Sequence, residues 1–309
     1  MTTRFYFHPV CIEHEPAPGH PESPARLRTI ADVLAAPAFD DLERHSPPEA
    51  AREHLTLVHP EDYVARVFDL VPSEGHSRID ADTLMSPKSG EAALRAAGAL
   101  VDAVDAVMTG AADNAFCAMR PPGHHAEPTQ GMGFCLFNSV AIGAEHARTA
   151  HGAERVAVMD FDVHHGNGTQ AMFWNEPNLF YASTHQSPLY PGTGSTGERG
   201  VEGNIVNAPL AASSGSDAFR AAMTDTILPA LRRFDPDFVF ISAGFDAHFA
   251  DPLANLNLQD EDYAWVTAEL MQVAAECCDG RLVSTLEGGY DLAALARSTA
   301  AHVHTLMTA

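Results

Sequence analysis

Apolar residues in this chain gather in short, almost continuous runs that alternate with longer stretches of helical spacing. The runs are 114–119, 155–161, 178–184, 237–244 and 281–286. The stretches are 89–109, 138–150, 216–234 and 260–278, each with a Ser, Asn or Asp near its start, as helix N-termini prefer. Strands buried on both faces read as continuous apolar runs. The alternation therefore predicts a mostly parallel sheet with helices on both faces.

Polar or glycine-rich segments follow all of the predicted strands. In chain order they read RPPGHH, DVHHGNG, HQSPLYPGTG, FDAHFADP and EGGYD. In open α/β sheets the ligand site lies outside the carboxyl ends of the strands. We therefore expect these segments to converge on one pocket.

The segment after the second run places ionisable side chains at every second position. Asp160, Asp162 and His164 would emerge on one side of an extended backbone, while Phe161 and Val163 pack on the other. Carboxylates and an imidazole gathered on one face stay costly to bury unless cations or hydrogen bonds offset their charges. A bound metal ion is one solution, and a hydrogen-bonded structural cluster is the other.

A further carboxylate favours the metal. Asp246 follows the fourth run, in SAGFD. With Asp162 and His164 it makes three protein ligands, the number that leaves a coordination position open in catalytic zinc sites. Two oxygen donors and one nitrogen also suit Fe(II) or Co(II).

Paired histidines follow the first run. His124 and His125 offer a general base for a metal-activated water and a general acid for a leaving amine. Asp160 and Asn167 are candidate partners that orient the two rings. A carboxylate partner raises the basicity of an imidazole, whereas an amide orients the ring with less effect on its basicity.

The last glycine pair predicts a turn that presents a tyrosine to the pocket. Gly288 and Gly289 permit backbone angles that other residues avoid, so Tyr290 can point its hydroxyl at a developing oxyanion. Asp291 is expected to cap the final helix.

The composition bounds the class of protein. The chain has 309 residues, 46% of them hydrophobic, which predicts one globular domain over 1–309. No apolar stretch approaches the roughly 20 residues of a membrane span, and no signal-peptide pattern opens the chain. The five cysteines show no CxxC pair, so we expect reduced thiols and a cytoplasmic protein without membrane contact. Cys135, near the histidine pair, is either redox-active or a buried inert thiol.

The net charge and the histidine content limit the kinds of ligand that the protein is expected to bind. A formal net charge of −23 argues against nucleic-acid binding and favours cationic ligands. The seventeen histidines include scattered ones, among them His54 and His151, which we expect to be exposed or hydrogen-bonded.

Several of these segments together carry a resemblance. They are RPPGHH (120–125), GFCLFN (133–138), DFDVHHGNGTQ (160–170), PGTG (191–194), SAGFD (242–246) and LEGGY (286–290). In this order they resemble the zinc-dependent histone deacetylase family, most of all its class II and bacterial amidohydrolase branch. The resemblance runs from HPESPARL (20–27) to the last helix. It implies the arginase/deacetylase fold, a single α/β domain with a central eight-stranded parallel sheet flanked by helices. The implied reaction is metal-dependent hydrolysis of N-acetyl-lysine, or of a related acylated amine, to free amine and acetate.

Site roles follow from the same resemblance. It implies that Asp162, His164 and Asp246 bind Zn²⁺, and that Tyr290 polarises the acyl oxygen. His125 is the implied general base and acid, with His124 as its electrostatic partner. Asn167 stands where some relatives have a second aspartate, which weakens any charged relay to His125.

A structural potassium ion is also implied. Its ligands would come from Asp160, Ser183, Thr184 and the backbone around Asp162 and His164.

The implied substrate channel is lined by aromatic residues. Phe134, next to Gly133, and Tyr190 would wall a channel for acyl-lysine, and Asp82 would contact substrate backbone at its rim. Leu253 stands where polyamine-specific relatives carry a glutamate that contacts a second ammonium group. A leucine cannot make that contact, so this position favours acyl-lysine over a polyamine as the substrate.

Arg26, in HPESPARL, resembles an arginine near an internal acetate exit. A surface salt bridge is the alternative for this side chain.

Three other functions remain open on the sequence. The chain could be an acetylpolyamine amidohydrolase, which its acidic charge also suits. It could bind acyl-lysine without catalysis, although such a protein needs no general base. A dinuclear manganese hydrolase of the arginase type would need further ligands, of which His248 is a candidate.

Overall fold

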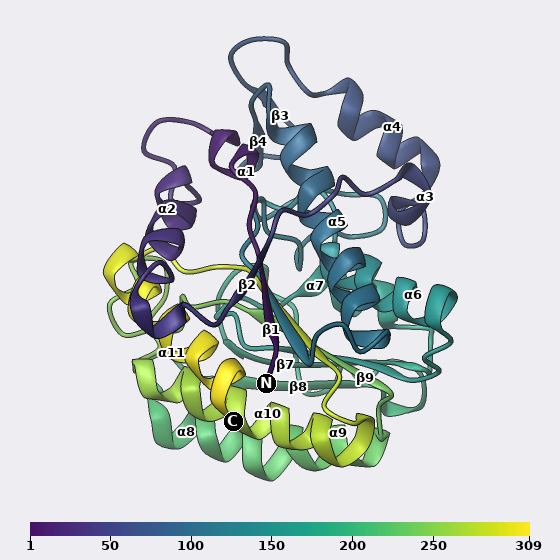
Figure 1. Cartoon of the computed structure of the whole chain (residues 1–309), viewed down its shortest axis with the longest axis vertical. Coiled ribbons are helices and arrows are strands. Elements are labelled where there is room, and N and C mark those ends of the chain that lie inside the picture. The colour runs from purple at the N-terminus through teal and green to yellow at the C-terminus, as the bar shows by residue number, and fades with distance from the viewer.

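An eight-stranded parallel sheet forms the centre of the computed structural model, which describes all 309 residues (Figure 1). Its strands are β1 (Thr3–Tyr6), β2 (Glu43–His45), β5 (Asn114–Cys117), β6 (Val156–Asp160), β7 (Leu179–Gln186), β8 (Ile205–Leu210), β9 (Phe238–Ala243) and β10 (Leu282–Leu286). They lie in the order β2-β1-β5-β10-β9-β6-β7-β8, and every pair is parallel. The predicted parallel sheet is therefore confirmed.

The helices connect and cover these strands. They are α1 (Val10–Glu13), α2 (Pro24–Val33), α3 (Arg52–Leu55), α4 (Glu61–Asp69), α5 (Ser89–Met108), α6 (Ser139–His151), α7 (Asn167–Phe173), α8 (Ser216–Ala222), α9 (Leu228–Phe234), α10 (Asp260–Cys278) and α11 (Leu292–Thr308). Short 3₁₀ turns occupy Pro37–Phe39 and Val201–Gly203, and a separate antiparallel hairpin joins β3 (Ser77–Arg78) to β4 (Leu84–Met85).

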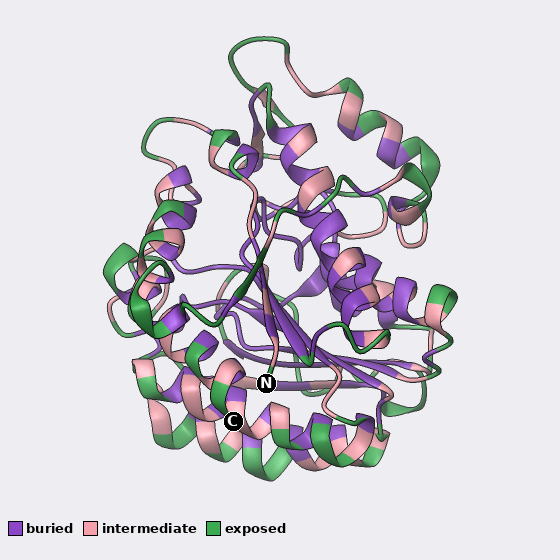
Figure 2. Cartoon of the chain, viewed as in Figure 1, coloured by how far each residue is buried: buried purple, intermediate pink, exposed green.

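Figure 1 shows α8 to α11 along one face of the sheet and α5 and α6 on the other. Figure 2 shows buried strands at the centre and helices whose outer surfaces are exposed. The main core contains 67 buried apolar residues from the sheet and both helical layers. A smaller cluster of 12 lies mainly between α4, α5 and the segment 136–142. The sheet is thus covered on both sides, as its continuous apolar strands require.

The apolar pattern located five of the eight strands to within two residues of their observed ends. It missed β1, β2 and β8, for two physical reasons. β1 and β2 are only four and three residues long, and β2 is a polar edge strand of sequence ERH. β8, at the other edge, is interrupted by Asn207 and Pro209, and proline is tolerated mainly on edge strands.

The stretch 216–234 is not one regular helix. A π-helical turn, Met223–Ile227, separates α8 from α9, and Pro229 lies in the first turn of α9. Proline has no N–H for the helical hydrogen bond to the residue four positions earlier, so the regular ladder is interrupted here.

No helix in the structure combines the length and apolar character that crossing a membrane requires. All five cysteines are unpaired. Cys135 is fully buried, and burial raises the pKa of its thiol well above the usual range, which favours the inert thiol over the redox-active one.

A neutral histidine holds α11 against the core. The hydroxyl of Thr267 donates to the backbone of Tyr263, so the Nδ1–H of His302 must donate to Thr267 Oγ1 at 2.6 Å. Ser284 Oγ then donates to Nε2 at 2.8 Å. Burial lowers the pKa of His302 to about 3, which keeps the ring uncharged at neutral pH.

We expect His302→Ala to destabilise the fold by about 3 kcal/mol, because it leaves a cavity and removes the partners of two buried hydroxyls. Chemical denaturation followed by circular dichroism measures this change. His304→Ala, an exposed position on the same helix, serves as the control and should change stability by less than about 0.5 kcal/mol. Equal effects of the two substitutions would contradict the assigned role of His302.

Candidate active site

The segments that follow β6 and β9 bring three metal-ligating side chains together. One ligand atom each from Asp162, His164 and Asp246 lies within 4.8 Å of the others. His164 Nδ1 is 3.1 Å from Asp162 Oδ1 and 3.2 Å from Asp246 Oδ2. β6 itself ends at Asp160, so Asp162 and His164 lie in the turn beyond the strand and not on it. Phe161 and Val163 nevertheless pack in the main core, as their alternation predicts.

The backbone orients both carboxylates of this group toward the imidazole. Gly288 N–H donates to Asp162 Oδ2 at 2.8 Å, and Val163 N–H donates to Asp246 Oδ1 at 2.9 Å. The remaining oxygen of each carboxylate faces His164. A Cβ atom at Gly288 would collide with both carboxylates, and one at Gly244 would collide with Asp162. Glycine is therefore required at both positions.

The electrostatics of the group call for a cation. Burial and the charge of Asp162 raise the pKa of Asp246 to about 7. Burial opposes protonation of His164, but the two carboxylates outweigh it and raise its pKa to about 10. Protons would thus gather where the ligand atoms meet, and a divalent ion can replace them. Two oxygens and one imidazole nitrogen fit such an ion.

The paired histidines lie beside this group with different partners. The ring centroids of His124 and His125 are 4.0 Å apart, and that of His125 is 6.0 Å from that of His164. His124 Nδ1 is 2.9 Å from Asp160 Oδ2, and His125 Nδ1 is 2.8 Å from Asn167 Oδ1. The structure therefore places both predicted orienting residues against the predicted rings.

The amide of Asn167 fixes the tautomer of His125. Its Nδ2 donates to Glu127 Oε1 at 2.8 Å, so its oxygen must face the imidazole. An amide oxygen only accepts, so His125 Nδ1 carries the hydrogen and Nε2 keeps a free lone pair.

The two rings differ in protonation. Burial disfavours charge on His124, but Asp160, Asp162 and Glu287 outweigh it and raise its pKa well above the usual range. Burial lowers the pKa of His125 well below that range, and the neighbouring histidines add to this effect. These shifts favour a protonated His124 and a neutral His125 at neutral pH.

The glycine turn after β10 presents Tyr290 to the same region. Gly289 has φ 123°, in a region that favours glycine. Tyr290 N–H donates to Asp251 Oδ2 at 2.7 Å, and the ring lies 6.1 Å from Phe134 and 5.0 Å from the Arg26 guanidinium. Asp291 caps α11 by accepting from Ala294 N–H at 2.8 Å, as predicted.

Aromatic residues lie around the histidine pair. The ring of Tyr190 packs edge-on against His125 at 5.2 Å. A Cβ at Gly133, which has φ 56°, would collide with the His125 ring. Phe134 also has a positive φ, 70°, which turns the chain so that its ring reaches Tyr290.

Asp82, which the sequence predicts at the rim, is joined to Phe134 through one hydroxyl group. Thr83 Oγ1 accepts from Phe134 N–H at 3.0 Å and donates to Asp82 Oδ1 at 2.9 Å, so Asp82 is linked to the aromatic wall. Tyr190 and Leu253 are 38% and 37% exposed, which leaves both side chains accessible from solvent.

The predicted potassium ligands lie on neighbouring strands. Asp160 on β6 and Ser183 on β7 are partners in the sheet register, and Thr184 follows Ser183. Ser183 Oγ lies 2.9 Å from His185 Nδ1, and Tyr181 donates to Asp160 Oδ2 at 3.1 Å. The potassium ion stays a prediction.

A buried ion network behind the site shows that the surface alternative for Arg26 is wrong. Arg26 is fully buried, and its Nε donates to the backbone of Gly289 at 2.6 Å. Its NH1 donates to Glu22, which also accepts from Arg120 through both of its carboxylate oxygens. The network thus fixes the turn that carries Tyr290.

Sequence reasoning missed further residues that support the site. Glu287 accepts from the backbone N–H of Gly123 at 2.8 Å, and Asp251 holds the backbone of Tyr290. Glu22, which binds Arg26 and Arg120, was missed as well. The signal was available for Glu22 and Glu287, because they lie in HPESPARL and LEGGY.

Comparison with known proteins identifies the family. The model of the histone deacetylase domain matches residues 20–306. The chain belongs to the histone deacetylase family.

Individual relatives agree with this assignment. A histone deacetylase-like amidohydrolase of Pseudomonas aeruginosa is 39% identical over 93% of this chain and 81% of its own length. A probable deacetylase of Archaeoglobus fulgidus is 40% identical over 94% and 82%. The crystal structure of the HDA15 HD domain matches with a TM-score of 0.94 at 35% identity, covering 99% of this chain and 88% of that one. This histone deacetylase family member therefore has the arginase/deacetylase fold and is a hydrolase of the deacetylase and amidohydrolase type.

The arginase-type alternative finds no support in the deacetylase site. His248 Nε2 is 3.2 Å from Asp260, and its Nδ1 accepts from Ala250 N–H at 3.1 Å. Both ring nitrogens are thus engaged away from Asp162, His164 and Asp246.

We expect Asp246→Ala to abolish tight metal binding at this group, because it removes one of the three predicted protein ligands. Metal content after dialysis, measured by mass spectrometry, should fall by about one ion per chain relative to the wild-type protein. Asp225→Ala, an exposed carboxylate on the π turn, is the control and should retain the ion. Full metal content in a folded Asp246→Ala variant would show that the ligand set is wrong.

Proposed function

We propose that residues 1–309 act as one catalytic domain, a zinc-dependent deacylase that hydrolyses the amide of N-acetyl-lysine or a related acylated amine. Asp162, His164 and Asp246 hold the metal. The observation that carries this proposal is the position of His125, whose Nδ1 faces Asn167 Oδ1 and whose ring lies 6.0 Å from that of His164 in the three-residue group. A protein that only binds acyl-lysine needs no general base there.

The residues of the chain divide the reaction between them. When bound, the metal lowers the pKa of water and polarises the acyl carbonyl. His125 Nε2 accepts a proton from the attacking water, and its hydrogen bond to Asn167 holds the ring in position. The Tyr290 hydroxyl donates to the oxygen that becomes negative as water adds to the carbonyl carbon.

Collapse of that adduct completes the hydrolysis. His125 returns its proton to the amine nitrogen as the C–N bond breaks, giving acetate and a free amine. His124 stays protonated beside Asp160 and contributes positive charge without exchanging its proton. Two adjacent histidines thereby serve different functions.

The channel favours a lysine side chain over a polyamine. The rings of Tyr190 and Phe134 suit an aliphatic chain, and Asp82 offers a hydrogen-bond acceptor to a peptide N–H. Leu253 is 37% exposed and cannot pair with a second ammonium group. The net charge of −23 attracts basic peptides and polyamines alike, so acetylpolyamines remain the second candidate.

The direct test compares kcat/KM for acetyl-lysine peptides, longer acyl-lysines and acetylated polyamines. We expect the acetyl-lysine peptide to give the highest value. Tyr290→Phe should reduce turnover about 100- to 1000-fold with unchanged metal content, because it removes one oxyanion donor. Binding without hydrolysis by the metal-loaded chain, or full activity of Tyr290→Phe, would refute the proposal. A preference for acetylated polyamines would change the proposed substrate and leave the proposed reaction unchanged.

The pH dependence tests the assignment of His125 as the base. Because His125 acts in its neutral form and its pKa is lowered, the acid limb of kcat/KM should lie below about pH 6.5. Asn167→Asp places a carboxylate against Nδ1, stabilises the protonated ring, and should move this limb upward by about 1 to 3 pH units. Asn167→Ala, the control, should lower activity without that upward shift. An acid limb that stays in place in Asn167→Asp would show that another group is the base.

A further inference from the structure

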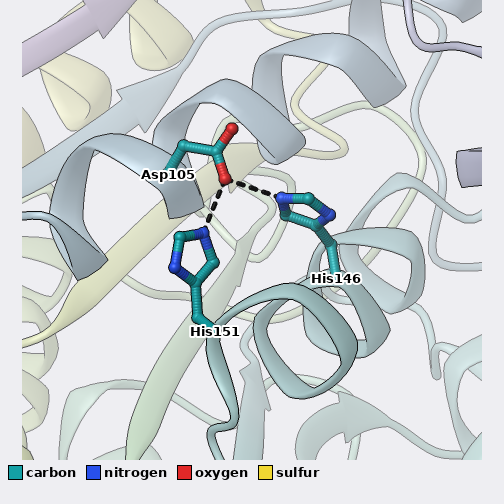
Figure 3. Close-up of side chains that lie close together, drawn as sticks. All are labelled: Asp105, His146 and His151. Atoms are coloured by element: carbon teal, nitrogen blue, oxygen red, sulfur yellow. Dashed lines mark hydrogen bonds and ion pairs between the residues drawn. The ribbon is translucent and has the colours of Figure 1, made fainter.

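A second group of metal-ligating side chains joins α5 to α6, away from the catalytic residues. Figure 3 shows Asp105 from α5 and two imidazoles from α6, His146 and His151, pointing at one another. The Nε2 atoms of His146 and His151 lie 2.7 and 2.6 Å from the same oxygen, Asp105 Oδ1. One ligand atom from each residue lies within 4.8 Å of the others.

The group lies near the amino-terminal ends of the strands, whereas the active site lies beyond their carboxyl-terminal ends. His151 is the last residue of α6, and β6 begins five residues later at Val156, whereas Asp160 lies at the far end of β6. Asp105 is likewise in the last turn of α5, which precedes the start of β5. Two helix C-termini, each with a partial negative charge, therefore meet beside a carboxylate. This arrangement favours a bound cation.

The tautomers leave both imidazoles free to bind an ion. Neither Nδ1 of His146 nor that of His151 is held by a protein partner, so each proton can move to Nδ1 and expose the Nε2 lone pair. The ring of His54 lies edge-on at 5.3 Å from that of His146, but its Nδ1 is engaged. Its Nδ1 accepts from Ala51 N–H at 3.2 Å, so its Nε2 keeps the proton.

The group is accessible to solvent ions. The side chains of Asp105 and His151 are 50% and 20% exposed, while that of His146 is 10% exposed. An ion can enter from solvent, and a water molecule can complete its coordination. Two nitrogen donors disfavour Mg²⁺ and Ca²⁺, which prefer oxygen, and favour a first-row transition ion such as Zn²⁺.

We propose that Asp105, His146 and His151 form a second binding site, for a divalent transition metal ion of the Zn²⁺ class. The ion links α5 to α6 and stabilises the fold without taking part in catalysis. The site is independent of the proposed deacylase function, since no residue is shared between them.

The test titrates Zn²⁺ into holoenzyme whose catalytic site is already loaded, using calorimetry and metal analysis. The wild-type chain should take up one further equivalent, and this ion should raise the Tm. His151→Ala and Asp105→Asn should each weaken that second binding at least about tenfold, since even outer partners of metal ligands contribute about 10- to 100-fold. His304→Ala, an exposed histidine on α11, should bind both equivalents, and Mg²⁺ should not substitute.

Two outcomes would overturn the proposal. One is wild-type holoenzyme that takes up no second equivalent, which would leave the group a hydrogen-bonded junction between helices. The other is a second equivalent that binds equally well to folded His151→Ala and Asp105→Asn, which would place it elsewhere.

Discussion

A cluster of fully buried carboxylates at the carboxyl edge of the sheet is the constraint on which this structure depends. Asp160, Asp162, Asp246 and Glu287 are all at most 1% exposed. Like charges in such a place are costly unless donors or cations surround them. Backbone N–H groups contact every one of these carboxylates, His124 pairs with Asp160, and Asp162, His164 and Asp246 form a group that could hold a metal ion. The glycines at 244 and 288 follow from the same need, because their missing side chains let backbone and carboxylate approach.

The same charges favour different protonation states for two neighbouring histidines. His124 and His125 are adjacent in sequence and both buried, yet the carboxylate of Asp160 favours the protonated form of one ring, while burial and the neighbouring histidines favour the neutral form of the other. Neutrality of His125 depends partly on the charge of His124, so the pair acts as a unit. The sheet makes this possible, because it delivers the partners Asp160 and Asn167 at the end of one strand and the start of the next helix.

The sequence predicted most of the sheet and the convergence of the site because both follow from local rules. Continuous apolar runs mark central strands, and parallel strands bring the segments after them to one edge. What it missed depends on neighbours distant in sequence. The burial of Arg26 depends on Glu22, Arg120 and the turn at Gly289, and no spacing within one segment shows that contact. Edge strands such as β2 carry too little apolar content to be recognised.

His151 illustrates the limit most clearly, because in sequence it is one scattered histidine among several. Its partner Asp105 lies 46 residues away, and the packing of α5 against α6 alone brings them together. The two ligand groups of this chain also differ in kind. The proposed catalytic group is buried, whereas the proposed second group is partly exposed and joins two helix C-termini, which carry partial negative charge. β6 separates the two groups and is hydrogen-bonded to β7 and β9 along its length. An ion bound at the helix ends would therefore change the stability of the fold and not the chemistry of the active site.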